Sequence, residues 1–576
     1  MGLTSALQIG RSGIMVSQAA IQVAGNNMAN AATEGYTRQV ASLTPAQGQR
    51  YGVNAFVGRG VQLEGIGRQV DEAVRSRLRL AVSEESAASV NLDLLSQTEA
   101  ILGELSDADL SSQLNSFFNS WSELANTPND MTARNVVISE GETLGLFLSR
   151  LRSDLTQLEE QIEEMLRGEV RHADELLSQA AQLNEDIVKA EQGRGEAGGL
   201  RDQRDIVLSE LSELMDVTIV EQASGAVDVL VGSLPVVLGN NSRGLELDVR
   251  TVDGQTVLSV RDKVGQSTLN IESGSIGARL SQRGELVQPT IDDLDAFTNA
   301  LIFEVNRIHS QSTGGTGFND ITGATIFTPE EAARALNAAD STLAFPVGNG
   351  TFEINLVNLD SGQRQTHQIE VDLDRIDDSG FAGTSDDDSL DDIIDKINAI
   401  DGVSAELDSQ GRLSISADGE RNVVTFSNDS NGFLAAAGIN SFFTGANAGD
   451  IGIADNVMND PAMLAVALDH VDGSNSGAVA MANLQTQGLE QLGGVSLRDS
   501  WLNTVSDVGI AGSAAGVRLE SATLVRESVQ GQDLASAGVS LDEESMNLLI
   551  FQNQYEASVR FLAVIDELTQ ALLGIV

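Results

Sequence analysis

Residues 2–31 read GLTSALQIGRSGIMVSQAAIQVAGNNMANA, and apolar or small side chains recur in this stretch at alternating spacings of four and three. A stripe with a period of about 3.5 residues is narrower than the core-facing side of a helix in a globular domain, and it is typical of a coiled-coil seam. The stretch therefore predicts a long helix that packs along a partner helix. The predicted seam consists of Leu3, Leu7, Gly10, Ile14, Ser17, Ile21, Ala24, Met28 and Ala31.

The other end of the chain shows the same pattern. Ser540 and Glu543 carry the signature of a capping box, which predicts the start of a helix that runs to the last residue. Glu544, Ser558 and Thr569 occupy the polar positions of its stripe. The predicted C-terminal seam consists of Leu541, Leu548, Phe551, Tyr555, Leu562, Ile565, Leu572 and Val576.

The two seams are complementary in size. The N-terminal seam includes small residues such as Gly10 and Ala24, whereas the C-terminal seam includes Phe551, Tyr555 and Leu562. This difference predicts that the two chain ends pair with each other in a coiled-coil domain made of residues 1–60 and 541–576. In the alternative arrangement, each helix docks on its own neighbouring domain.

Composition narrows the possible partners. A chain of 576 residues exceeds a single hydrophobic core, which predicts two to four domains. The formal net charge of −50 disfavours nucleic acid and anionic membranes as partners, and it makes self-association depend on apolar contacts or on screening by salt. Cysteine is absent, which excludes disulfides and suits a protein outside the reducing cytoplasm. The start of the chain lacks the basic and apolar regions of a cleavable signal, and no apolar run is long enough to span a membrane.

In the middle of the chain, the spacing of the apolar residues changes twice. Long helical patterns fill residues 61–216, and alternating strand patterns with glycine and asparagine turns, among them TLNIE at 268–272, predict a small β-rich part at 217–285. Helical patterns at 286–320 and 480–540 are assigned to the same bundle as 61–216, and residues 321–479 are predicted to form an outer β-rich module with short helices. The fold class is thus α+β and multidomain, with an elongated shape and both termini at one end.

Candidate chemical motifs are weak. GRGEAG at 193–198 follows a helix rather than a strand, so it predicts a turn between helices rather than a dinucleotide site. The four histidines are scattered, and the acidic run SDDDSLDD at 385–392 lacks the ligand spacing of a calcium loop, so capping of the next helix explains it more simply. We therefore predict no catalytic residues, no metal and no cofactor, and we do not expect an enzyme.

The end of the first helix resembles a signature of the bacterial flagellar rod, hook and hook-associated proteins. In that family, two asparagines, an apolar residue and Ala-Asn are followed by Thr-x-Gly-Tyr. The matching residues are Asn26, Asn27, Met28, Ala29, Asn30, Thr33, Gly35 and Tyr36, and the following Arg38 and Gln39 resemble the hook-associated branch. Gly35 is also expected to take the positive φ that ends a helix. Further stretches resemble the junction subunits of that branch; they lie at 117–138, 200–219, 292–309, 438–453 and 538–573.

The resemblance implies a structural subunit at the junction between hook and filament. It implies export through the flagellar type III apparatus to the cell exterior, and a cytoplasmic chaperone on the C-terminal helix, whose seam is the expected binding site. The implied partners are further copies of the chain, the hook protein below and a second hook-associated junction protein above. We expect the terminal helices to lack partners in the monomer and to order on assembly. A hook or distal-rod subunit is an alternative within the family, and a secreted adhesin or hydrolase on a helical stalk is an alternative of another class.

Overall fold

The computed structural model of the chain describes residues 2–51, 55–103, 109–192, 195–252, 255–315, 317–341, 343–376, 382–384 and 386–574. The chain divides into two compact units, and several long helices run through both. The terminal unit contains residues 1–94, 161–283 and 513–576. The middle unit contains residues 95–160 and 284–512.

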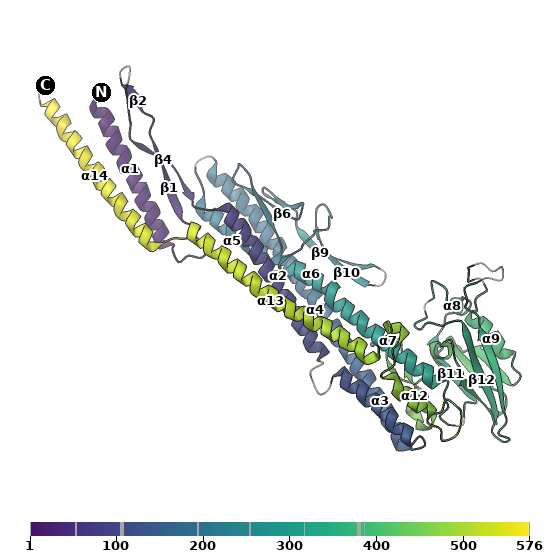
Figure 1. Ribbon diagram of the computed structural model, residues 1–576. Coiled ribbons are helices and arrows are strands. Elements are labelled where there is room, and N and C mark those ends of the chain that lie inside the picture. The colour runs from purple at the N-terminus through teal and green to yellow at the C-terminus, as the bar shows by residue number, and fades with distance from the viewer. Residues whose placement is uncertain are drawn as a thin grey trace. The chain divides into compact units, whose positions relative to one another are not determined.

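The chain ends of the terminal unit form a helical pair and a hairpin. Helix α1 (Gly2–Ala29) lies beside helix α14 (Leu541–Leu573), and the antiparallel strands β1 (Gln39–Pro45) and β4 (Val61–Arg68) lie on the other side of α1 (Figure 1). The short strands β2 (Gln49–Tyr51) and β3 (Ala55–Val57) extend this hairpin. Both described chain ends lie at the same end of the unit, which agrees with the prediction that the two termini lie together.

Long helices make up most of the remaining terminal unit, as the periodicity predicted. They are α2 (Glu72–Leu102), α4 (Met131–Glu191), α5 (Gly198–Leu214) and α13 (Leu497–Ala537). The short helix α6 (Gly274–Gln282) accompanies them. Helices α2, α4 and α13 continue into the middle unit. Helix α4 has an apolar stripe of Leu144, Leu148, Leu151, Leu155, Leu158 and Ile162, all of which are buried, whereas Met165 at the end of the stripe is exposed.

Two small antiparallel sheets complete the terminal unit. The first has the order β5 (Thr218–Glu221), β6 (Val227–Val231), β7 (Leu234–Leu238), β8 (Asn241–Ser242), and the second is the pair β9 (Leu245–Val252) and β10 (Gln255–Asp262). The expected strand at 268–272 is wrong, because this segment makes only an isolated bridge between Thr268 and Arg261. Helix α6 lies inside the span predicted to be β-rich, because its nine residues are too few for a clear helical period.

The helical part of the middle unit surrounds an aromatic core. A π-helical segment (Arg283–Val287) leads into α7 (Gln288–Ser310), and α3 (Leu110–Asn126) ends just before Pro128. Asp109 caps α3 by accepting a hydrogen bond from the Ser112 amide at 2.7 Å. Rings of α3 pack against those of a later loop, with the Phe117 and Phe442 centroids 5.8 Å apart. The smaller helical elements are α8 (Pro329–Ala332), α10 (Phe433–Ala436), α11 (Asp455–Asn459), α12 (Ser476–Leu484) and two 3-10 turns (Pro461–Met463 and Glu490–Leu492).

Two three-stranded antiparallel sheets share one apolar core in the middle unit. Their orders are β13–β12–β16 and β11–β15–β14, and helix α9 (Leu390–Asn398) packs on them. Strands β12 and β13 form an antiparallel hairpin inside the span predicted to be β-rich. The strands are β11 (Asp320–Ile326), β12 (Gly350–Asn358), β13 (Arg364–Val371), β14 (Val403–Leu407), β15 (Arg412–Ala417) and β16 (Asn422–Ser427), with a separate pair β17 (Phe443–Thr444) and β18 (Gly452–Ile453). Within the described residues, none of the helices has a stretch long and apolar enough to cross a membrane.

Candidate functional site

Helices α1 and α14 pack closely and antiparallel to each other. A Cβ atom on Gly10 would lie 2.7 Å from Leu562 Cγ, and one on Gly13 would lie 2.6 Å from Ser558 Oγ. Towards the other end of α1, the Asn27 amide nitrogen lies 3.2 Å from a Glu544 carboxylate oxygen. Small residues of α1 thus face larger side chains of α14. Because the pair forms within one chain, the expectation that the terminal helices lack partners in the monomer is wrong for this structure.

The structure places the predicted residues of α14 along one face. Positions 544, 548, 551, 555, 558, 562, 565 and 569 are all buried or half-buried, at spacings of four and three. Ile565 is the most buried apolar member, whereas Leu541 is exposed at the start of the helix. The Leu572 side chain and Val576 lie outside the described residues.

The buried face of α1 is wider than the predicted seam. Ala24 is buried and Leu3, Ile14, Ile21 and Met28 are half-buried, but Leu7 is exposed. Val16, Ala20 and Val23, which the pattern analysis did not select, are also buried. Together with Asn27 they form a second stripe at spacings of four and three, beside the first. This second stripe is the feature of the sequence that could have predicted that α1 packs against the hairpin as well as against α14.

The motif after α1 builds a hydrogen-bonded helix end. Asn30 Nδ2 donates to the Asn26 carbonyl oxygen at 2.9 Å, and Thr33 Oγ1 donates to Asn30 Oδ1 at 3.3 Å. Gly35 has a φ of +72°, and a Cβ atom there would lie 2.6 Å from the Ile206 side chain. The expected positive φ is therefore present. Met28 and Ala29 belong to the last turn of α1, where Ala29 is exposed.

Asn27 lies at the centre of this helix end and is buried. Its Nδ2 donates to the Gln39 carbonyl oxygen at 2.9 Å, and its Oδ1 accepts from Tyr36 Oη at 2.8 Å and from the Gln39 amide at 3.0 Å. Burial, with the nearby charges of Asp202 and Glu544, raises the pKa of the Tyr36 hydroxyl. The phenol therefore stays protonated and able to donate.

Glu544 joins the motif to the C-terminal helix. Its carboxylate is almost completely buried and accepts from Arg38 Nε at 2.8 Å, besides the contact with Asn27. Arg38 also lies 3.2 Å from Glu543, and its amide donates to the Ala537 carbonyl oxygen. Ser540 Oγ accepts from the Glu543 amide at 3.4 Å, as the capping-box prediction requires. In the sequence Glu544 stands out only as a polar position in the seam, because its partners lie more than 500 residues away.

An ion cluster lies next to the motif. Arg68 Nη1 lies 2.9 Å from Asp202 and 2.6 Å from Asp205, and Arg68 Nε lies 3.0 Å from Glu196. Arg75 also contacts Asp205. Burial lowers the pKa of the Arg68 guanidinium, but the charge and hydrogen bonds of Asp205, then those of Asp202 and Glu196, raise it above its usual value overall. The cluster therefore ties the end of the hairpin to α5 and to the turn before it.

The pattern analysis did not select these charged residues. Asp202 and Asp205 lie three apart on α5, within the stretch 200–219 that carried the family resemblance, and this spacing places them on one face of the helix. Within GRGEAG, Gly193 and Arg194 lie outside the described residues. The turn follows α4 and precedes α5, as predicted.

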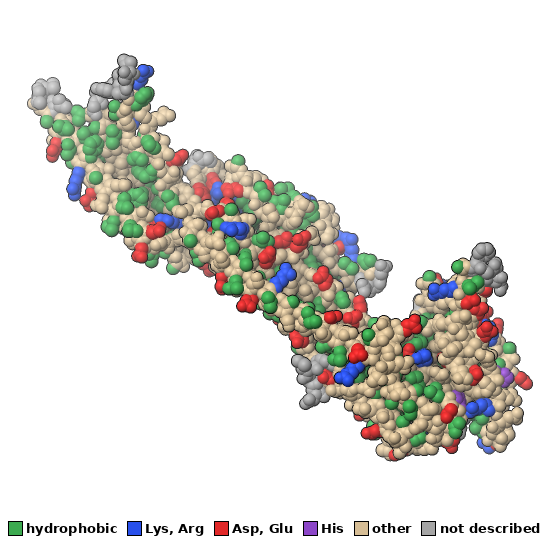
Figure 2. Space-filling model, in the orientation of Figure 1, with side chains coloured by type: hydrophobic (Ala, Val, Ile, Leu, Met, Phe, Trp, Pro, Cys, Tyr) green, Lys and Arg blue, Asp and Glu red, His purple; other side chains and the backbone are tan. Residues whose placement is uncertain are grey.

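Apolar side chains remain exposed on the terminal unit. Figure 2 shows hydrophobic side chains gathered over α14 and α1, at the end where the chain termini lie. On α14, for example, Leu549 is 59% exposed and Val564 is 53% exposed. The exposed large apolar side chains of α14 are Leu541, Met546, Leu549, Ile550, Val559, Phe561, Val564 and Leu568, and those of the hairpin are Val40, Leu43, Phe56, Val57 and Leu63.

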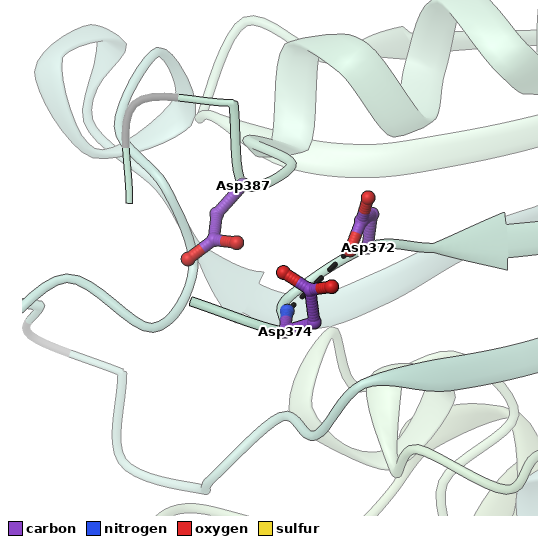
Figure 3. Close-up of side chains that lie close together, drawn as sticks. All are labelled: Asp372, Asp374 and Asp387. Atoms are coloured by element: carbon purple, nitrogen blue, oxygen red, sulfur yellow. Dashed lines mark hydrogen bonds between the residues drawn. The ribbon is translucent and has the colours of Figure 1, made fainter. Parts of the chain in front are cut away.

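Other polar clusters in the middle unit hold its loops. Oxygen atoms of Asp372, Asp374 and Asp387 lie within 4.8 Å of one another (Figure 3). Asp387 accepts hydrogen bonds from the Arg375 amide at 3.2 Å and from Asn337 Nδ2 at 2.8 Å, so it fixes the loop after β13. In the acidic run, Ser385 lies outside the described residues, and Ser389 with Asp392 forms a capping box at the start of α9. This run therefore caps a helix, as predicted.

His309 is fully buried in the middle unit. Its Nδ1 donates to the Asn440 carbonyl oxygen at 2.7 Å, and its Nε2 accepts from the Ala465 amide at 2.9 Å. Burial lowers the pKa of His309 to about 4. The neutral ring thus serves as a cross-link between three segments of the chain.

Comparison with known proteins connects this architecture to the flagellum. Residues 95–327 match the family described as "Flagellar hook-associated protein FlgK helical domain", 376–419 match the "Flagellin hook IN motif", and 530–575 match "Flagellar basal body rod FlgEFG protein C-terminal". The last match contains all of α14.

The relatives that align with the chain along its full length share one name. The chain is 26% identical to "Flagellar hook-associated protein 1" of Bacillus subtilis (strain 168), over 99% of this chain and 97% of the relative. It is 24% identical to the protein of the same name from Escherichia coli (strain K12), over 100% of both chains. "The structure of the flagellar hook junction protein FlgK from Burkholderia pseudomallei" is 17% identical with a TM-score of 0.50, covering 79% of this chain and 99% of that chain, and this likeness shows the fold. The chain is thus similar along its whole length to flagellar hook-associated protein 1, and its residues 95–327 match the helical domain of that family.

Proposed function

We propose that the chain is a structural subunit of the bacterial flagellum that forms the junction between hook and filament. It polymerises through its terminal helices at the distal end of the hook. The observation that carries this proposal is the apolar surface left on α14 and on the hairpin after α1 and α14 have paired. Clustered apolar side chains of this size on a folded chain indicate a surface that another protein covers.

Pairing within one chain changes how assembly is driven. The residues of the predicted seams already contact each other, so they supply a rigid terminal unit rather than the contact between subunits. Burial of the outward side chains of α14 then supplies the free energy of association, at about 25 cal/mol per Å² of apolar surface removed from water. This burial must exceed the repulsion between chains of net charge −50.

The partners follow from the resemblance to the flagellar axial proteins. Further copies of the chain, the hook protein below and a second hook-associated protein above contact the subunit in the flagellum. Before export, a cytoplasmic chaperone covers the C-terminal helix, and the protein then leaves the cell through the flagellar type III apparatus. The relatives are named as flagellar hook-associated proteins, which favours this function over the adhesin or hydrolase and over a hook or rod subunit.

A pair of substitutions on α14 tests the proposal. Leu549→Glu together with Val564→Glu places two charges on the exposed apolar surface, and we expect this variant to lose addition to purified hooks in electron micrographs. The control is Gln552→Glu with Gln554→Glu, which adds the same charge at exposed polar positions of the same helix. Normal addition by the first variant, with both proteins folded by circular dichroism, would refute assembly through this surface.

A further inference from the structure

The positive charge of this acidic protein is concentrated near the N-terminus. The first 80 residues contain eight arginines and four acidic residues, although the whole chain has a net charge of −50. Arg11 on α1 and Arg50 and Arg59 on the hairpin are exposed. Arg59 Nη2 donates to Gln8 Oε1 at 3.1 Å, so this guanidinium is held beside α1.

The hairpin that carries these arginines is also apolar on its surface. Phe56 is 76% exposed, and Val57 and Leu63 are exposed as well. A two-stranded ribbon alone is marginally stable in water, and an exposed phenylalanine on it gains nothing for the isolated chain. The ribbon of β2 and β3 therefore has the composition of a contact surface, because Phe56 lies opposite Arg50 in the strand register.

The outward face of α14 has the opposite charge. The helix contains six acidic residues and one arginine; Glu544 is buried and Glu543 pairs with Arg38, and the other four acidic residues are exposed. Asp566 and Glu567 are exposed near its C-terminal end, beside the exposed side chains of Val564 and Leu568. This face is thus apolar and acidic, whereas the hairpin is apolar and basic.

The two surfaces lie on opposite sides of α1. In Figure 1 the order across the layer is α14, α1 and hairpin, and α1 contacts both of its neighbours. Gly10 of α1 faces Leu562, and Gln8 holds Arg59, so Arg59 and the segment around Leu562 lie at a similar height along α1. Asp566 and Glu567 follow Leu562 by about one turn. Copies placed side by side would therefore bring Arg59 of one copy near this acidic turn of the next.

We propose that the hairpin of one copy packs against the outward face of α14 in the adjacent copy. This inference rests on the proposed function and names the two surfaces that meet. The occupant is a second copy because the complementary surface belongs to this same chain and lies on its opposite side. A contact between two different surfaces is heterologous, and repetition of it generates a ring or an open helix. Attraction between these two surfaces offsets the repulsion between the acidic remainders of neighbouring copies.

A charge swap tests the pairing. Arg50→Glu with Arg59→Glu places like charges opposite each other, so we expect at least about tenfold more protein to be needed for half-maximal addition to hooks. Adding Asp566→Arg and Glu567→Arg to the same chain restores the attraction in every copy, and addition should return to within about threefold of wild type. Unchanged addition by the hairpin variant, or no recovery by the fourfold variant, would overturn the pairing.

The wild-type protein separates this inference from the proposed function. If wild-type protein fails to add to hooks, the proposed function fails. If wild-type protein adds normally but the charge-swap variants do not give the results stated above, only the proposed contact between hairpin and α14 fails. The altered side chains are exposed, so circular dichroism should show unchanged helix content in all variants.

Cross-linking tests the contact without altering charge, because the natural chain has no cysteine. Phe56→Cys and Val564→Cys are prepared as separate proteins, assembled together on hooks and treated with a short bismaleimide. We expect dimers in the mixture and none in either variant assembled alone. Dimers from Phe56→Cys alone would show a contact between two hairpins, and absence of dimers from the mixture would show another neighbour; both results contradict the proposal.

Discussion

Asn27 connects three segments of the terminal unit through one side chain. Its amide contacts the backbone of Gln39, the hydroxyl of Tyr36 and the carboxylate of Glu544, and it is buried. We predict that Asn27→Ala lowers the free energy of unfolding of this unit by about 2–4 kcal/mol, because buried partners lose their hydrogen bonds. Hydrogen exchange of the α14 amides measures the effect.

The neighbouring asparagine supplies the control for that prediction. Asn26 is exposed, and its Nδ2 donates to Tyr36 Oη at 3.2 Å. Asn26→Ala should cost less than about 1 kcal/mol, since water replaces the lost contact. Equal effects of the two substitutions would show that burial of Asn27 does not stabilise the unit.

His309 makes the stability of the middle unit depend on pH. Its pKa is lowered to about 4 in the folded chain by burial, against about 6.5 in an unfolded chain. The stabilisation is complete above about pH 6.5, and it decreases as pH falls towards about 4, because only the unfolded chain binds the proton. We predict a loss on the order of 3 kcal/mol over this interval.

Tryptophan fluorescence during denaturant unfolding measures this loss, because both tryptophans, Trp121 and Trp501, lie in the middle unit. Carboxylates also titrate at the lower end of the range, so the wild type is compared with His309→Gln, whose amide does not titrate. The two proteins should differ in the slope of stability against pH. Parallel slopes would contradict a neutral buried His309.

At the residue scale, the sequence identified the motif but not its partners. Two asparagines followed by a glycine and a tyrosine carried the family resemblance and the expected turn at Gly35. Glu544 and Arg68 could not be predicted as partners of the motif, because charged residues are frequent in this chain and only the fold shows which of them are buried. Long-range pairing of charges leaves no local pattern.

At the scale of elements, the pairing of α1 with α14 depends on glycine at position 10. Gly10→Ala would gain up to about 1 kcal/mol in helix propensity, but the added Cβ atom would lie 2.7 Å from Leu562 Cγ. We predict a net destabilisation of the terminal pair by about 1–2 kcal/mol, because Leu562 must leave its packed position. Faster hydrogen exchange in α14 would report it.

Gly25 provides a matched control in the same helix. A Cβ atom at Gly25 meets no other atom within 4 Å, so Gly25→Ala should stabilise α1 by about 0.5–1 kcal/mol. The two alanine substitutions are therefore expected to have opposite signs. If both stabilise the pair, close contact between the helices is not the reason for glycine at position 10.

Elements with a long, regular period were predictable, and short ones were not. The 61 residues of α4 carry enough repeats to define a helical face, and the helix lies within the span 61–216 that was predicted to be helical. The nine residues of α6 do not, and the segment at 268–272 alternates without a partner strand on which to form a ladder. The buried face of α1 is broad because the helix contacts the hairpin as well as α14, and its second stripe of Val16, Ala20 and Val23 was the pattern that could have shown this.

At the scale of the whole molecule, the net charge of −50 opposes the folded state through repulsion between carboxylates. We predict that raising the salt concentration from about 0.05 M to about 0.5 M raises the thermal unfolding midpoint, because the screening length falls below about 10 Å. Calorimetry measures the shift. An uncharged osmolyte at equal osmolality is the control, and an equal shift with both would exclude screening as the cause.

The division of the molecule into two units could not be derived from the sequence. Composition predicts several domains, but α2, α4 and α13 run through both units without a break in their helical patterns. Contacts within a unit also join residues that are distant in the sequence. In the ion cluster, for example, Arg68 of the hairpin contacts Asp205 of α5, more than 130 positions later. Sequence order therefore does not mark the boundary.

The antiparallel pairing of the chain ends has a practical consequence for labelling. An affinity tag or fluorescent protein fused to either end would sit on the same small region, and both fusions would obstruct the same neighbours. The exposed turn between β12 and β13, at 359–363, offers an internal insertion point in the other unit. A probe placed there would leave both extremities of the polypeptide available for docking.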